Sequence, residues 1–375
     1  MDVIDKYTGR SMGSVPTATE DDVRAAVAKT EAAFPGWAET PAHRRAAILS
    51  AAAAGLRERR DEIAVTICRE AGKAWKYSSA EVDRGIETFT FAAEEAKRIH
   101  GETIPMDASP AGEHRIGFYL RTPVGVVTAI TPFNFPLNLV AHKVAPALAA
   151  GNSVVLKPAE DTPLTAVILH EVLATAGLPD GAFTLVHGDG PTVGEWLVTD
   201  PRPAMISFTG SPPVGARIHA LAGLKRVTLE LGNNSGTIIE PDANLDRAVP
   251  RCVMSAFANA GQVCISLQRL FVHEAVAPAF LKRFLEATSA LKVGNPLDHD
   301  CDVGPMISDE AADRAVARIL AAVDEGAQMR VGGTREGRLV WPTVLTGTRP
   351  EMKVMCQEAF APLVSIVTYR RFEDA

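Results

Sequence analysis

The sequence predicts an α/β protein built on two parallel sheets that are covered by helices. Strand-like apolar runs alternate with helix-like segments from Gly125 to Leu231, and a second alternating set follows from Thr237 onward. Alternation at this spacing is typical of βαβ units, whose parallel strands lie buried between layers of helices. The length of 375 residues supports this prediction, since it is enough for two domains that each bury a core.

Residues 20 to 100 are expected to be helical. Thr19 precedes three acidic residues, the pattern of an N-cap followed by a favourable first turn. The apolar residues then recur at helical spacing, and Pro35-Gly36 is expected to end this helix. A second helix is expected after Thr40-Pro41, with proline in its first turn, and a third over Ser78 to His100.

Residues 101 to 121 predict a two-stranded ribbon. Two strand-like pieces, Glu102–Pro105 and Arg115–Leu120, flank the turn-rich stretch from Asp107 to Gly112. A ribbon of two strands is marginally stable alone in water. We therefore expect it to pack on a neighbour such as another subunit.

The remaining elements follow in two sets. Strands of the first set are expected at Val126–Thr131, Asn152–Lys157, Ala182–His187, Ala204–Thr209 and Val227–Leu231, with helices at Asn138–Ala149, Thr162–Ala176, about Thr192–Val198 and Pro212–Leu221. Strands of the second set are expected at Thr237–Ile239, Arg269–Val272 and Leu363–Tyr369, with helices at Leu245–Ala258, Val276–Leu291 and Asp309–Glu325. We place the domain boundary near Leu231-Gly232.

Composition excludes several classes of partner. The net charge is −7 and no long Lys/Arg run occurs, so nucleic acid is not an expected partner. The five cysteines are odd in number and scattered, which favours thiols in a reducing cytoplasm over disulfides. Met1–Lys6 has no secretory character, and the longest apolar stretch, Ala46–Leu56, is too short to span a membrane. No metal site is expected.

Two glycine-containing turns are candidates for binding phosphate, because parallel sheets bind ligands at the carboxyl ends of their strands. Gly190 and Gly194 lie in a strand-to-helix turn whose spacing departs from the dinucleotide fingerprint. Gly210 and Ser211 precede a helix with two prolines in its first turn, and Ser211 could cap this helix, whose N-terminus could receive a phosphate. Both stretches are equally well explained as tight turns that need small residues.

A third turn offers a cation and a carboxylate at the same sheet edge. Lys157 ends a strand, and Glu160 follows three residues later. A carboxylate here could accept both hydrogen bonds from a ribose diol, and it would repel a 2′-phosphate. This pattern favours NAD over NADP.

The candidate catalytic residues are a cysteine, a glutamate and an asparagine. Cys264 follows Gly261-Gln262, where a bend can present its sulfur, and Glu230 ends an apolar strand upstream. A soft nucleophile with a carboxylate that can activate water indicates covalent catalysis followed by hydrolysis. Asn134 lies in a stiff, proline-flanked turn and could stabilise an oxyanion, an effect of ~2.7–4 kcal/mol per donor. Alone, each residue also has an ordinary explanation: a buried thiol, a solvated carboxylate, and an amide that satisfies its own turn.

Taken together, these stretches resemble the aldehyde dehydrogenase superfamily. The resemblance covers nearly the whole chain, and six motifs occur in one order. They are Pro132-Phe133-Asn134-Phe135-Pro136, Lys157-Pro158-Ala159-Glu160, Phe208-Thr209-Gly210-Ser211, Leu229-Glu230-Leu231-Gly232, Gly261-Gln262-Val263-Cys264 and Gln357-Glu358-Ala359-Phe360-Ala361-Pro362.

The resemblance implies a role for each candidate. Cys264 would attack the aldehyde, Asn134 and the Cys264 backbone N–H would hold the oxyanion, and Glu230 would activate the water that releases the acid. Residues 1–230 would form a Rossmann-like NAD-binding domain with an oligomerisation arm at about 101–121, and residues 231–375 the catalytic domain. The residues implied to bind the cofactor are Thr131, Phe133, Lys157, Glu160, Gly190, Gly194, Gly210, Ser211, Leu231, Glu358 and Phe360.

The chain departs from the family pattern in three places. Asn233-Asn234 stands where Gly-Lys is commoner, and Ala361 replaces a glycine. The sequence also ends at Ala375, before family members end, so we expect a chain that lacks the last part of the catalytic domain. Whether these residues alone are active is left open.

The expected substrate is a small polar or anionic aldehyde, such as a lactaldehyde, a semialdehyde or a phosphorylated aldehyde. This expectation rests on three residues. His142 and Ala258 fall where relatives that favour apolar aldehydes carry an aromatic residue, and Asn138 is also polar. His142 is equally well explained as a packing residue. The full-length form is expected to be a homodimer or homotetramer. Two other functions remain open, an acylating enzyme that passes its acyl group to coenzyme A and a non-catalytic homologue.

Overall fold

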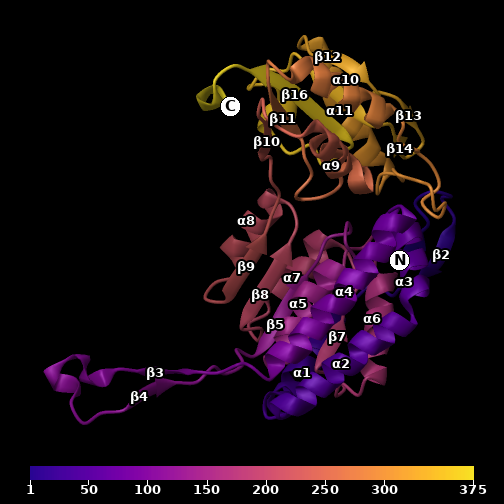
Figure 1. Cartoon of the computed structure of the whole chain (residues 1–375). Coiled ribbons are helices and arrows are strands. Elements are labelled where there is room, and N and C mark those ends of the chain that lie inside the picture. The colour runs from indigo at the N-terminus through magenta and orange to yellow at the C-terminus, as the bar shows by residue number, and fades with distance from the viewer.

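The computed structural model describes residues 1–375 and contains two five-stranded sheets joined in sequence between β9 and β10 (Figure 1). The first sheet has the order β7-β6-β5-β8-β9, and all of its strands are parallel. Its strands are β5 (Val126–Ile130), β6 (Ser153–Lys157), β7 (Phe183–Leu185), β8 (Met205–Thr209) and β9 (Arg226–Glu230). The predicted alternation of strands and helices is confirmed here.

Helices cover both faces of the first sheet. They are α1 (Glu20–Ala38), α2 (Ala42–Glu58), α3 (Arg60–Ala71), α4 (Trp75–Ala96), α5 (Asn138–Ala149), α6 (Leu164–Thr175), α7 (Glu195–Thr199) and α8 (Pro212–Leu221). On β5, Val127 and Ala129 join the large core under α2 to α6, whereas Val126 and Ile130 face the smaller cores under α1, α7 and α8. This alternation follows from the two-residue period of a strand.

The first helix corrects one prediction. Thr19 forms the expected N-cap, with a capping box to Asp22, but the helix continues through Pro35 to Ala38 instead of ending there. Proline removes only its own N–H donor, and its carbonyl still accepts the Glu39 N–H at 3.1 Å. Trp37 in the last turn is almost completely buried, so core packing outweighs the local preference of proline.

The second sheet has the order β10-β11-β16-β15-β12. It is not wholly parallel as predicted, because the edge strand β12 runs antiparallel to β15. Its elements are β10 (Gly236–Ile239), α9 (Leu245–Phe257), β11 (Arg269–His273), α10 (Ala277–Ser289), α11 (Asp309–Asp324), β12 (Gln328–Val331), β15 (Thr343–Thr346), α12 (Lys353–Cys356) and β16 (Leu363–Tyr369). Two small hairpins, which the sequence did not predict, are β1 (Asp2–Ile4) with β2 (Ser11–Ser14) and β13 (Arg335–Glu336) with β14 (Leu339–Val340).

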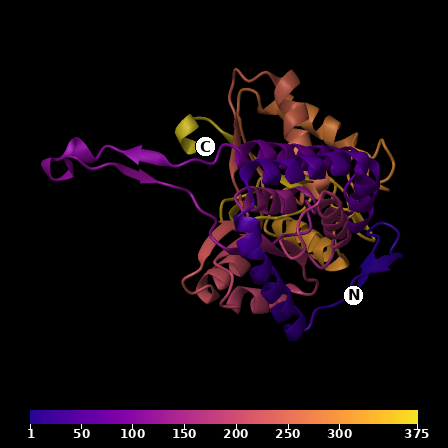
Figure 2. The same cartoon turned by 90° about the horizontal axis from the view of Figure 1, so that it is seen from below.

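The predicted ribbon is present as β3 (Glu102–Ile104) and β4 (Gly117–Tyr119), which pair antiparallel. It projects far from the rest of the chain in two perpendicular views (Figures 1 and 2). Ile116 is 91% exposed, and Phe118 and Leu120 are also exposed. None of the helices combines the length and the apolar character that a membrane crossing needs.

Candidate active site

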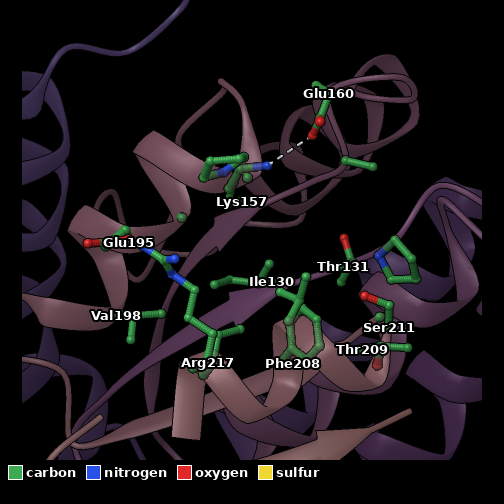
Figure 3. A pocket seen from close by; sticks show the side chains of 18 of the residues that line it. Ile130, Thr131, Lys157, Glu160, Glu195, Val198, Phe208, Thr209, Ser211 and Arg217 are labelled. Carbon is green, nitrogen blue, oxygen red and sulfur yellow. Dashed lines mark hydrogen bonds and ion pairs between the residues drawn. The ribbon is translucent and has the colours of Figure 1, made fainter. Parts of the chain in front are cut away.

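A groove of about 390 Å³ lies at the carboxyl ends of β5, β6 and β8, between α7 and α8 (Figure 3). Eight of the predicted cofactor residues line it: Thr131, Phe133, Lys157, Glu160, Gly190, Gly194, Gly210 and Ser211. They come from four separate loops, which the parallel topology gathers at one sheet edge. Ile130, Val198 and Phe208 supply an apolar wall.

Lys157 and Glu160, the cation and carboxylate in the turn after β6, face each other in this groove. Lys157 is buried, and its Nζ lies 3.4 Å from Oε2 of Glu160 and 3.2 Å from the carbonyl oxygen of Pro158 (Figure 3). Burial lowers the pKa of Lys157, and the charge of Glu160 opposes this shift. The Glu160 side chain is exposed, so its oxygens remain accessible to a ligand.

Ser211 occupies the N-cap position of α8, but its hydroxyl makes no capping hydrogen bond. The next two residues are Pro212 and Pro213, which have no backbone N–H. Among the first three helical residues only Val214 therefore has an N–H donor. An anion at this helix end would depend on that N–H, the free Ser211 hydroxyl and the helix dipole.

An ion pair that the sequence did not reveal also lines the groove. Arg217 on α8 donates through Nη2 to the carboxylate of Glu195 on α7 (Figure 3). Each residue alone is an ordinary surface charge on a helix. Only the packing of α7 beside α8 brings them together, so no local sequence signal could have shown the pair.

A second pocket of about 260 Å³ adjoins the groove. The two share Pro132, Phe133, Thr209, Gly210 and Ser211 as lining residues, so they lie side by side. Cys264, Asn134, Leu231, Glu358 and Phe360, all predicted site residues, line this second pocket. The candidate nucleophile and oxyanion donor thus lie at one end of the candidate cofactor groove.

The loop before Cys264 has a strained backbone. Asn259, Ala260 and Gly261 have φ values of 51°, 54° and 69°, a left-handed run that costs of order 1–3 kcal/mol at each non-glycine residue. A Cβ atom on Gly261 would lie 2.0 Å from the Ala361 carbonyl oxygen, so only glycine fits there. This bend leaves Cys264 partly exposed at the pocket.

Hydrogen bonds from distant segments hold this loop. Asn134 donates through Nδ2 to the carbonyl oxygen of Gln262 at 2.9 Å, and the Ile307 N–H donates to Oε1 of Gln262 at 3.0 Å. Asn233 donates through Nδ2 to the Cys264 carbonyl oxygen. Asn233 belongs to the departure from the family pattern noted above, and this contact gives it a structural role that the sequence did not show.

Asn134 is buried and 2% exposed. A side-chain amide has two N–H donors, and the Gln262 carbonyl takes one of them. Its Oδ1 atom has no hydrogen-bond partner. The second N–H makes no hydrogen bond within the chain, and Asn134 lines the second pocket.

Burial raises the pKa of the Cys264 thiol, and the negative charges of Glu358 and Glu230 raise it further. The resting side chain is therefore the protonated thiol at neutral pH. Burial also raises the pKa of Glu358, while the Asn233 N–H, which donates to Oε1 at 3.2 Å, lowers it. A proton acceptor is consequently needed before Cys264 can act as a nucleophile.

Glu230 lies exposed at the end of β9 and lines neither pocket. Its charge nevertheless acts on Cys264 and on Lys143. Burial lowers the pKa of Lys143 to about 8, and its Nζ donates to Oγ of Ser207 at 3.2 Å. The carboxylate is thus near the thiol but open to water.

The three predicted substrate residues do not line either pocket. Asn138 is buried, and the Thr88 hydroxyl donates to its Oδ1 at 3.4 Å. His142 is exposed one turn further along α5, and Ala258 is partly buried. Partial burial lowers the pKa of His142, and the positive charges of Arg84 and Lys143 add to this shift.

Comparison with known proteins gives a family match along the whole chain. The model of the aldehyde dehydrogenase family matches residues 1–375. The 3-sulfolactaldehyde dehydrogenase of Priestia aryabhattai is 46% identical over 374 residues, which cover 100% of this chain and 78% of that protein.

Two solved structures share the fold. Aldehyde dehydrogenase 21 of Physcomitrella patens, in complex with the reaction product succinate, has a TM-score of 0.97 and 40% identity, covering 100% of this chain and 78% of that one. The glyceraldehyde-3-phosphate dehydrogenase GapN of Methanocaldococcus jannaschii, complexed with NADP, has a TM-score of 0.95 and 38% identity, covering 100% of this chain and 81% of that one.

Proposed function

This chain belongs to the aldehyde dehydrogenase family of NAD(P)-dependent enzymes, and we propose that it oxidises a small polar or anionic aldehyde to the carboxylic acid with NAD. The observation that carries the proposal is that the pocket lined by Cys264 and Asn134 adjoins the candidate dinucleotide groove and shares five lining residues with it. A thiol alone would bind many electrophiles. A thiol beside an amide donor at the end of such a groove suits oxidation of a carbonyl carbon.

The residues of the groove fit a dinucleotide. The apolar wall of Ile130, Val198 and Phe208 suits an adenine ring, and the carboxylate of Glu160 beside Lys157 suits a ribose diol. The free Ser211 hydroxyl at the start of α8 suits the pyrophosphate. NAD is favoured over NADP because a 2′-phosphate would meet the negative charge of Glu160.

The first half of the reaction uses Cys264 and Asn134. After its proton passes to a water molecule at the partly exposed thiol, the Cys264 sulfur attacks the carbonyl carbon, a C–S bond forms, and the carbonyl π electrons move onto oxygen. Asn134 Nδ2–H and the Cys264 backbone N–H stabilise this oxyanion. The groove residues would hold NAD, which would supply the hydride acceptor for the substrate carbon. A thioester on Cys264 remains.

The second half uses Glu230. Its carboxylate removes a proton from a water molecule, whose oxygen attacks the thioester carbon. The C–S bond then breaks, the sulfur leaves as a thiolate, and the carboxylic acid departs. The exposure of Glu230 leaves it open to water for this step. A hydrolytic carboxylate at this place disfavours transfer of the acyl group to coenzyme A.

The substrate class follows from the relatives. Of the three similar proteins named above, one is named for a sulfonated aldehyde, one was solved with the dicarboxylate succinate as its reaction product, and one is named for a phosphorylated aldehyde. We infer that the aldehyde of this chain also carries an anionic or hydroxyl group.

The division of the chain into a dinucleotide-binding part, residues 1–230, and a catalytic part, residues 231–375, is part of this proposal. The ribbon is proposed to pair with a second copy in a homodimer or homotetramer, because it is apolar and projects into solvent. Replacing Ile116 and Phe118 with serine should then shift the sedimentation coefficient toward that of the monomer.

The test of the proposed function is a screen for NADH formation with sulfonated, phosphorylated, carboxylated, hydroxylated and purely apolar aldehydes. The expected result is turnover of one of the first four classes, with the free acid as product. Product that forms only in the presence of coenzyme A would instead support the acylating function. Dinucleotide binding with no turnover of any aldehyde would support a non-catalytic homologue.

A further inference from the structure

Two helices that follow the functional loops have no cap of their own. Helix α5 begins after Leu137 and α6 begins after Pro163, and neither residue makes a side-chain capping bond. The first N–H groups of a helix have no partner within the helix, so buried ones need an acceptor from elsewhere. In both helices this acceptor is a carboxylate from another helix.

Glu81 of α4 supplies the acceptor for α5. Its Oε1 accepts the N–H groups of Leu137 at 2.9 Å and Asn138 at 3.0 Å. Glu70 of α3 supplies the acceptors for α6: Oε2 accepts the N–H of Leu164 at 2.8 Å and Oε1 that of Thr165 at 3.1 Å. Helix α4 packs against α5, and α3 packs against α6 (Figure 1).

Both carboxylates are completely buried, and Glu81 is also ion-paired there. Its second oxygen, Oε2, lies 2.5 Å from Nζ of Lys73, which is buried as well. The same ammonium lies 3.5 Å from the centre of the Phe135 ring. Phe135 and Leu137 are thus held on either side of Pro136, immediately after Asn134.

The contacts of Leu137 are close enough to make this loop rigid. A Cβ atom on Gly85 of α4 would lie 2.8 Å from Cδ2 of Leu137, so α4 approaches the loop as closely as a glycine allows. Leu137 itself is completely buried. A shift at Glu81 would therefore move the turn that presents Asn134.

Glu70 acts on the neighbouring loop in the same manner. The Thr165 hydroxyl also donates to its Oε1. Between Glu160 and the start of α6, Asp161 lies at the groove and is ion-paired with the buried Lys6 at 3.0 Å. The segment that carries Glu160 is therefore held at its far end by Glu70.

We propose that Glu81 and Glu70 are positioning residues, Glu81 for the loop that presents Asn134 and Glu70 for the loop that presents Lys157 and Glu160. The two loops follow the adjacent strands β5 and β6. Glu81 thus serves the chemical step and Glu70 serves dinucleotide binding. The first half of this assignment rests on the proposed function, since it takes Asn134 as the oxyanion donor.

The test compares Glu81→Leu, which removes the single oxygen that accepts both N–H groups, with Glu70→Gln. Glu81→Leu should lower kcat by about tenfold or more, toward the hundredfold loss that a misplacement of roughly 1 Å causes, while the Kd for NAD stays unchanged. Glu70→Gln should raise the Kd for NAD by about tenfold and leave kcat at saturating NAD unchanged. Amide hydrogen exchange should speed up only in residues 131–138 for the first variant and only in residues 157–165 for the second.

Matched controls exist on the same helices. Asp83→Asn on α4 and Glu62→Gln on α3 each remove a carboxylate that pairs with a surface arginine, Arg60 and Arg59 respectively. Neither control should change kcat, Kd or local exchange. If Glu81→Leu does not fold because Lys73 is left unpaired, the double variant Lys73→Met/Glu81→Leu removes that charge and should show the same loss of kcat.

Three outcomes would overturn the proposal. Loss of stability with kcat, Kd and local exchange unchanged would show that both carboxylates are merely structural. Equal effects of both variants on kcat and Kd would contradict the division between them. Unchanged hydrogen exchange in residues 131–138 and 157–165 would contradict the capping itself. Hydrogen exchange and NAD binding do not require turnover, so these two measurements test the capping even if no aldehyde is oxidised.

Discussion

Asn134→Ala is the substitution whose effect on catalysis can be separated most clearly from its effect on stability. The side chain lines the second pocket, donates to the Gln262 carbonyl and has a further N–H that makes no hydrogen bond within the chain. Loss of an oxyanion donor costs about 2.7–4 kcal/mol in the transition state, or roughly a hundredfold to a thousandfold in kcat. We expect a loss of kcat in that range.

The stability cost should be smaller. The Gln262 carbonyl loses its 2.9 Å bond to Asn134 but keeps a weaker one from Asn259 Nδ2 at 3.4 Å. Loss of one buried hydrogen bond with partial replacement costs about 1 kcal/mol. Urea unfolding should therefore show a modest decrease, too small to explain a hundredfold loss of turnover.

The assay is single-turnover NADH formation, with Asn152→Ala as the matched control. Asn152 is also a buried asparagine, and its Oδ1 accepts the N–H groups of Val124 at 2.7 Å and Gly125 at 3.2 Å, away from the pocket. The control should lose at least as much stability and keep its kcat. Equal losses of kcat in both variants, or a loss below tenfold for Asn134→Ala, would refute the oxyanion role.

Three further predictions concern charge. Glu358→Gln removes a negative charge that raises the pKa of the Cys264 thiol, so the rate of alkylation of Cys264 should rise at lower pH than in the wild type; an unchanged pH profile would contradict this coupling. Glu160→Gln should lower the Kd for NADP relative to that for NAD, measured by fluorescence titration, because the repulsion of a 2′-phosphate is removed. Burial raises the pKa of Glu70 from 4.5 to about 7. Between pH 4.5 and pH 7 the folded protein therefore keeps a proton on Glu70 that the unfolded chain has released. Stability should fall as the pH rises through this range, by about 3 kcal/mol at ~1.4 kcal/mol per pKa unit, and Glu70→Gln should flatten that slope in urea titrations.

The part of the fold that the sequence predicted depends on local periodicity. The strands and helices from Val126 to Glu230 alternate at short spacing, and the parallel arrangement then places their carboxyl-end loops at one edge. That rule also accounts for the gathering of Lys157, Gly190 and Ser211 in one groove. Each of these residues ends a strand or begins a helix that local patterns identify.

The features that the sequence did not predict depend on distant contacts. Leu137 and Leu164 are 56 and 94 residues from the carboxylates that bind their N–H groups. Arg217 meets Glu195 only because α8 packs beside α7, and helix α1 passes through Pro35 because Trp37 is buried. The local sequence pattern does not identify such distant partners.

The second sheet shows the same limit. Strand β12 lies at an edge and pairs antiparallel with β15, and both strands are short. An edge strand is bonded on one side only, so its direction is set by the length and path of its connections rather than by its own residues. The prediction therefore missed β12 and β15, and it was wrong about the direction of the edge strand β12.

The proposed mechanism requires the substrate to become covalently attached to Cys264. This attachment can be detected by mass spectrometry of the Glu230→Gln variant, quenched soon after mixing with NAD and an aldehyde that the wild type oxidises. We expect one acyl group on the peptide that contains Cys264, in amount equal to the NADH released. NADH release with no acyl group on that peptide would contradict it.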